Sequence, residues 1–169
     1  MFAKLLARDL SIVALTALIW NLGAAASAHP GMRGDVAGVL AGATIGICAY
    51  LAHEWGHLLG AVLTGSTVRP GKTLASGFLF SFDSHANTRR QFLTMSFAGW
   101  LATAVVLWMV YSLLPAGLFA SRVACGVVAA NVLLVIAVEV PLVVYSLWTG
   151  RVPPVENQAV ASPLAATTD

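Results

Sequence analysis

Charged residues are scarce in this chain. Only 9% of its 169 residues are Asp, Glu, Lys or Arg, whereas 59% are hydrophobic. A soluble domain has roughly 25% charged and about 45–50% apolar residues. One core of this size cannot hide so much apolar surface, so lipid must cover the rest. The composition therefore argues against a soluble enzyme and a disordered chain, and the net charge of +2 is too small to indicate a nucleic acid as partner.

Cysteine is scarce as well. Cys48 and Cys125 both lie inside apolar runs, and neither belongs to a CxxC pair. We expect both to be small buried hydrophobic residues, and a disulfide framework is not indicated.

Four apolar stretches are long enough to cross a bilayer, which takes about 20 mostly apolar residues. They cover residues 10–28, 36–63, 92–114 and 123–148. We therefore predict an all-α membrane protein with four transmembrane helices, in one polytopic domain over residues 1–150. The Pro-containing remainder, residues 151–169, predicts a disordered cytoplasmic tail.

The first stretch has a second interpretation. Lys4 and Arg8 precede it, and Ala26-Ser27-Ala28 resembles a signal-peptide cleavage site. We favour a retained helix, because the apolar stretch is longer than the about 7–15 residues of a signal-peptide core.

Positive charges orient the chain, because cytoplasmic loops of membrane proteins carry an excess of Lys and Arg. With the N-terminus inside, seven of the nine fall on the cytoplasmic side and two outside. The seven are Lys4, Arg8, Arg69, Lys72, Arg89, Arg90 and Arg151, and the two are Arg33 and Arg122. We expect a multi-pass protein of a bacterial cell (inner) membrane, with both termini in the cytoplasm.

The loop over residues 64–91 is long for so small a protein. It contains an apolar and aromatic run from Ser76 to Phe82 that is too short to span a bilayer. Its alternation and glycine predict a short hairpin or a re-entrant segment at the membrane edge, with a plain interfacial loop as the alternative.

The chemistry is indicated by His53-Glu54-Trp55-Gly56-His57, an HExxH pattern within the second apolar stretch. Residues i and i+4 share one helix face, so His53 and His57 can direct two imidazoles at one metal ion. Glu54 lies about 100° round the helix and can act as general base on a zinc-bound water. Ionisable side chains are rare in membrane helices without a function. An internally satisfied polar patch is the alternative.

A catalytic zinc usually has three protein ligands, so one more is needed. The candidates are Glu139, Asp83, His85 and His29. His29 would lie on the outer side, whereas Glu139 would lie at nearly the depth of His53. We therefore predict His53, His57 and Glu139 as ligands of Zn²⁺, and a substrate-binding or gating role for Asp83 and His85. A re-entrant loop could instead bring one of these two to the metal.

Glycines indicate how a neighbouring helix would reach the metal. Gly38, Gly42 and Gly46 are spaced by four, on nearly the face that carries His53. Small residues let helices approach closely. We expect this face to bring the helix of Glu139 within reach.

These residues resemble the site-2 protease family of intramembrane zinc metalloproteases, over about residues 49–103. The HExxH pattern matches the family's HExGH, and Ser96-Phe97-Ala98-Gly99 is similar to its small-residue "AGP" helix. The resemblance implies three core helices, His53 and His57 as ligands and Glu54 as catalytic base. Trp100 replaces the family's proline, and Leu147-Trp148-Thr149-Gly150 lacks the acid of the family's LDG motif.

Two functions follow as expectations. The first is a zinc-dependent metalloprotease that hydrolyses a peptide bond in or near a transmembrane segment of a membrane protein substrate. The second is a catalytically inactive, metal-binding membrane scaffold that binds partner helices.

Overall fold

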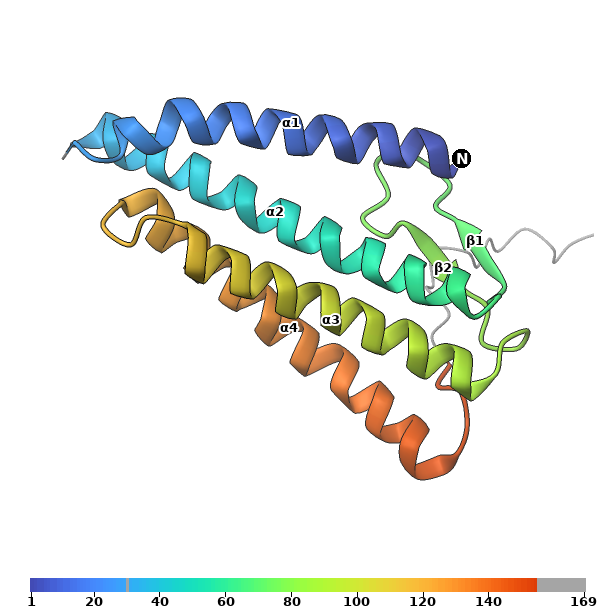
Figure 1. Cartoon of the computed structure of the whole chain (residues 1–169). Coiled ribbons are helices and arrows are strands. Elements are labelled where there is room, and N and C mark those ends of the chain that lie inside the picture. Colours follow the sequence, from blue (N-terminus) through green and yellow to red (C-terminus); the bar gives the residue numbers. More distant parts are fainter. Residues whose placement is uncertain (30, 155–169) are drawn as a thin grey trace, which may run out of the picture.

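The described residues form a bundle of four helices with one hairpin at its end (Figure 1). The computed structural model describes residues 1–29 and 31–154. The elements are α1 (Phe2–Ala26), α2 (Met32–Leu63), β1 (Val68–Pro70), β2 (Phe80–Phe82), α3 (Arg89–Leu113) and α4 (Phe119–Thr149). Most of the expected disordered tail, from residue 155 onward, lies outside the described residues.

Each expected helix is present, and each begins earlier than its apolar stretch. Polar side chains are compatible with the first turn of a helix, and some of them stabilise it. Thr88 precedes α3, where its hydroxyl accepts the Gln91 backbone N–H while the Gln91 side chain accepts the Thr88 N–H. This capping box starts the helix before the apolar residues do. α1 likewise includes Lys4, Arg8 and Asp9, so it covers residues 2–26 rather than 10–28.

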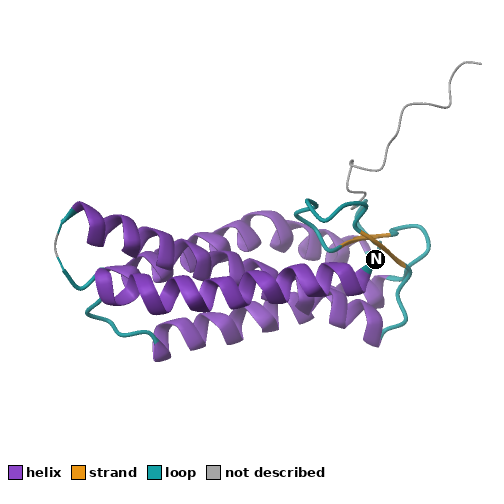
Figure 2. Ribbon diagram, turned by 90° about the horizontal axis from the view of Figure 1, so that it is seen from above, coloured by secondary structure: helices purple, strands orange, loops and turns teal. Residues whose placement is uncertain are grey.

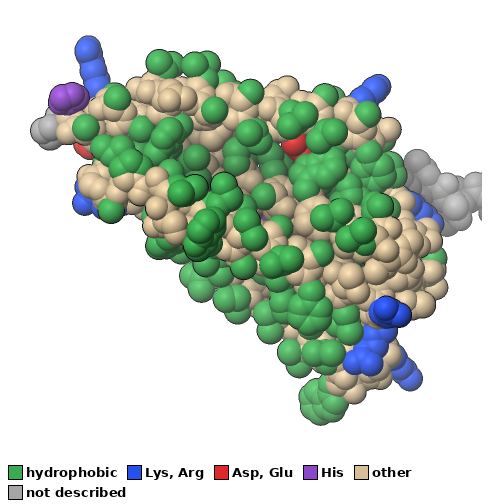
Figure 3. Space-filling view, viewed as in Figure 1, with side chains coloured by type: hydrophobic (Ala, Val, Ile, Leu, Met, Phe, Trp, Pro, Cys, Tyr) green, Lys and Arg blue, Asp and Glu red, His purple; other side chains and the backbone are tan. Residues whose placement is uncertain are grey.

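Within the described residues, α2, α3 and α4 are long and apolar enough to cross a membrane. α1 does not meet the same criteria, so a fourth crossing stays a prediction. The side chains of the helices fit a lipid environment. In α4, Leu133, Leu134 and Val138 are each exposed by 60% or more. Figure 3 shows hydrophobic side chains along the helices and Lys and Arg at the two ends of the bundle.

α2 lies at the centre and packs against each of the other three helices. Its glycines allow this packing. A Cβ at Gly42 or Gly46 would overlap Val123 or Val127 of α4. Further along α2, a Cβ at Gly56 or Gly60 would overlap the backbone of α3. The close approach of α4 to the glycine face is therefore confirmed, and it brings residues of α4 near the HExxH turn.

The hairpin joins α2 to α3 and lies at the same end of the bundle as the N-terminus (Figure 2). Its strands pair antiparallel, with Val68 opposite Phe82. Phe80 and Phe82 are buried, and both belong to a core cluster with Phe92 and Leu79. The predicted hairpin is therefore present. Its second strand is shorter than the apolar run, because residues 76–79 form a loop before β2, in which the Leu79 carbonyl accepts the Gly71 N–H.

Candidate metal centre

His53 and His57 of α2 and Glu139 of α4 converge on one point. Glu139 Oε1 lies 2.7 Å from His53 Nε2 and 3.3 Å from His57 Nε2, and the two Nε2 atoms are 2.9 Å apart. The site is largely enclosed, since His53 is only 5% exposed. The structure thus brings together the three residues that the sequence analysis selected as ligands, at a spacing close enough to bind a metal ion.

The other imidazole nitrogen of each histidine has a partner on α3. His53 Nδ1 lies 2.8 Å from Thr103 Oγ1 and 3.2 Å from the Gly99 carbonyl oxygen. Thr103 donates its own hydroxyl hydrogen to that carbonyl, so its oxygen accepts from His53. His57 Nδ1 lies 2.9 Å from the Met95 carbonyl oxygen. These partners assign the proton of each neutral ring to Nδ1 and leave a lone pair on Nε2.

This donor set fits a divalent metal. With both rings protonated at Nδ1, two Nε2 lone pairs and one carboxylate oxygen face one another, close enough to bind one metal ion. Imidazole nitrogen and carboxylate oxygen are both common zinc ligands, and three protein ligands leave a position open for water or substrate. The backbone and hydroxyl oxygens behind the rings are the outer partners that metal-binding histidines usually have.

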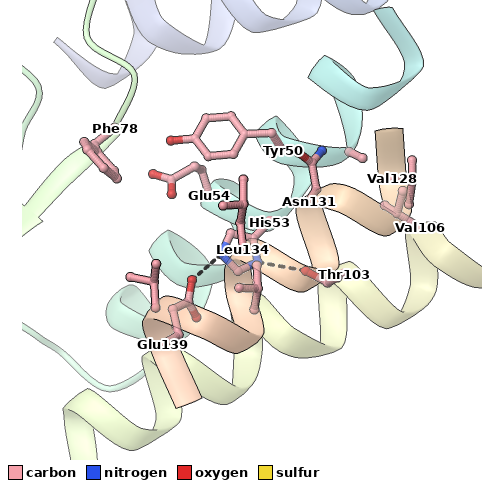
Figure 4. A pocket seen from close by; sticks show the side chains of 13 residues that line it. Tyr50, His53, Glu54, Phe78, Thr103, Val106, Val128, Asn131, Leu134 and Glu139 are labelled. Carbon is pink, nitrogen blue, oxygen red and sulfur yellow. Dashed lines mark hydrogen bonds and ion pairs between the residues drawn. The ribbon is translucent and has the colours of Figure 1, made fainter. Parts of the chain in front are cut away.

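Glu54 is the residue of α2 that follows His53, and its side chain lies beside this cluster (Figure 4). It is 7% exposed, and its Oε2 accepts the Leu79 backbone N–H at 3.3 Å. Two cavities of about 270 and 220 Å³ flank it, and Glu54, Phe78, Val138 and Glu139 line both. Most of the remaining lining side chains are apolar. The carboxylate of Glu54 therefore lies between two largely apolar cavities.

Residues 74–79, which we call the strap, form a loop that lies beside Glu54. Arg8 of α1 donates to the carbonyl oxygens of Leu74 and Ser76, at 2.7 and 3.0 Å. Tyr50 donates its hydroxyl to the Gly77 carbonyl at 2.9 Å. The strap is thus held at several points between α1 and α2, and it carries the N–H that contacts Glu54.

Replacing Arg8 by Leu is expected to loosen the strap. A hydrogen bond from a charged group contributes about 1.5–3 kcal/mol, so losing both should speed amide exchange of residues 74–79 about tenfold or more. Hydrogen exchange followed by mass spectrometry measures this. Lys4→Leu, an exposed change on the same helix, is the control and should leave the strap unchanged. Equal amide exchange of residues 74–79 in both variants would show that the Arg8 hydrogen bonds do not hold the strap in place.

Asp9 adds a second link between α1 and α2. It is 4% exposed, pairs with Arg8 and accepts the Trp55 indole N–H at 2.9 Å. Sequence reasoning did not select Asp9, Trp55 or Tyr50. The signal available was the Arg8-Asp9 pair at the start of an apolar helix, since buried ionisable groups need partners.

Asp83 and His85 lie in the turn after β2, and neither belongs to the cluster or lines the two cavities beside it. Asp83 accepts the backbone N–H groups of Ala86 and His85 and pairs with Arg69. These bonds, first that from Ala86, hold the pKa of the Asp83 carboxyl below its usual range. His29 lies in the turn between α1 and α2. A gating role for Asp83 and His85 stays a prediction.

One further side chain touches a ligand of the cluster. Trp100 of α3 donates its indole N–H to Glu139 Oε2 at 2.8 Å. No family model, curated protein or solved structure matches the chain, so this geometry and the residue chemistry carry the functional interpretation.

Proposed function

We propose that the protein is an intramembrane zinc metalloendopeptidase. In this proposal His53, His57 and Glu139 hold the zinc ion, and Glu54 is the general base. The substrate is a transmembrane segment of another membrane protein, in which one peptide bond in or near the bilayer is hydrolysed. The resemblance to site-2 proteases leads to the same proposal from the sequence.

One observation carries this proposal. Three lone-pair atoms within 4.8 Å of one another lie beside a buried carboxylate that is not part of their set. A metal-binding scaffold needs the first feature alone, whereas hydrolysis needs both. The apolar cavities on either side of Glu54 add support, because a membrane-spanning substrate is itself apolar.

When bound, a divalent ion polarises a carbonyl and lowers the pKa of an attacking water to about 7. Glu54 accepts the proton of that water and passes it to the leaving amine, which is general acid–base catalysis. The Leu79 N–H donates a hydrogen bond to the Glu54 carboxylate and orients it, but it transfers no proton. Glu54 is only 7% exposed and its side chain lies among largely apolar walls, so few groups compete with the water for its carboxylate.

We propose further that α1 crosses the membrane with the other three helices, and that the hairpin end faces the cytoplasm. α1 has 25 residues and runs along α2 (Figure 1). The hairpin end carries most of the Lys and Arg residues, as the positive-inside rule requires for this orientation.

The test uses the full chain reconstituted in lipid vesicles with solubilised bacterial membrane proteins. New N-termini within apolar segments are identified by mass spectrometry. Treatment with a zinc chelator is expected to abolish these cleavages, and added zinc should restore them. Vesicles without the protein are the control. Stoichiometric zinc without any new N-terminus would contradict the protease and favour the scaffold.

A further inference from the structure

The two carboxylate oxygens of Glu139 have different partners. Oε1 faces the two imidazoles, whereas Oε2 accepts the indole N–H of Trp100 at 2.8 Å. An indole N–H only donates and is uncharged, so Trp100 cannot itself be a metal ligand. The indole thus contacts one oxygen of Glu139, while the other oxygen lies beside the histidines.

Trp100 is itself held in place. Its ring makes an edge-to-face contact with Phe97, with 5.2 Å between the ring centroids. Both residues lie on α3. Trp100 also packs against the core cluster that contains Leu58 and Met95, so the indole has contacts both on its own helix and with the core.

α3 contributes a partner to each of the three candidate ligands but no ligand of its own. The Met95 carbonyl contacts His57, and Thr103 contacts His53. Trp100 completes this pattern on Glu139. Without Trp100, α3 would still contact the two histidines of α2, but it would have no hydrogen bond to Glu139 of α4.

We propose that Trp100 is a positioning residue, which holds Glu139 so that it binds the metal through Oε1 alone. This inference rests on the proposed metal site. Binding through one oxygen keeps the remaining positions open, which water and a scissile carbonyl need in a hydrolytic site. Bidentate binding by Glu139 would occupy one of them.

Trp100→Phe tests this proposal, since it removes the N–H and keeps a ring against Phe97. Zinc affinity, measured by competition with a chromogenic chelator, is expected to fall about 10–100-fold, as for other partners of metal ligands. The absorption spectrum of the Co²⁺-substituted protein should also change. Trp108→Phe is the matched control, because Trp108 is 65% exposed on the same helix. It should leave both readouts unchanged.

A double-mutant cycle separates positioning from a loss of packing. Trp100→Phe is repeated in a Glu139→Ala background, where only the two histidines remain as ligands. If Trp100 acts through Glu139, the second substitution leaves the residual zinc affinity unchanged. If Trp100 merely supports the bundle, affinity falls by a similar factor in both backgrounds, and the proposal is overturned.

The remaining outcomes separate this inference from the proposed function. Wild-type affinity and spectrum in Trp100→Phe would overturn the role of Trp100 and leave the metal centre intact. Absence of stoichiometric zinc in the wild-type protein would overturn both.

Discussion

Replacing Glu54 by Gln is expected to abolish proteolysis while leaving zinc bound. Removal of a general base lowers the turnover rate by about 10²–10⁴-fold. Gln is close in size to Glu, and its side-chain oxygen can still accept the Leu79 N–H, so the strap should stay in place. The measurement is the rate of substrate cleavage together with zinc content per chain.

Two further variants make this result specific. Asp35→Asn changes an exposed acid to an amide on the same helix and should retain full activity. His53→Ala removes a candidate ligand and should lose both zinc and activity. If Glu54→Gln turns over substrate at the wild-type rate, Glu54 is not the base.

Replacing Gly99 by Ala is expected to disrupt the metal centre through a single methyl group. The position of a Cβ at Gly99 is filled by the His57 ring, whose three nearest atoms all belong to the imidazole. The ring must move, and its Nε2 then leaves the point shared with His53 and Glu139. We expect loss of stoichiometric zinc and a destabilisation of about 1–3 kcal/mol, as for other overpacked sites.

Gly126→Ala provides the comparison, because a Cβ there enters open space on α4. Alanine also has a higher helix propensity than glycine, so this variant should be at least as stable as the wild type. Zinc content and thermal unfolding in detergent are measured for both. Equal zinc in the two variants would show that His57 does not depend on the missing side chain at residue 99.

The helices were predictable because the apolar stretches are long and contain few ionisable residues, and hydropathy requires no knowledge of tertiary contacts. The residues at which the helices begin were not predictable from hydropathy, because the first turns contain polar residues. Thr88 and Gln91 start α3 before its apolar stretch. In α1, the helix includes Arg8 and Asp9, whose side chains have partners in the strap and on Trp55.

The cluster was predictable to a similar degree. Helical periodicity places His53 and His57 on one face, and helix depth selects Glu139 among four candidates. The depth argument works because α2 and α4 pack closely at Gly42 and Gly46. Trp100 and the strap could not be found in this way. Their contacts join α3 to α4 and α1 to the hairpin loop, and no local pattern encodes such pairs.

The candidate ligands come from two helices, α2 and α4, which pack closely at Gly42 and Gly46. An ion at this point would act as a removable cross-link between them. Its binding free energy would add directly to the energy that keeps α4 docked. If α4 moved outward to admit a substrate helix, Glu139 would move away from the two histidines and the metal coordination would weaken. Opening of the bundle and retention of the metal would therefore oppose each other.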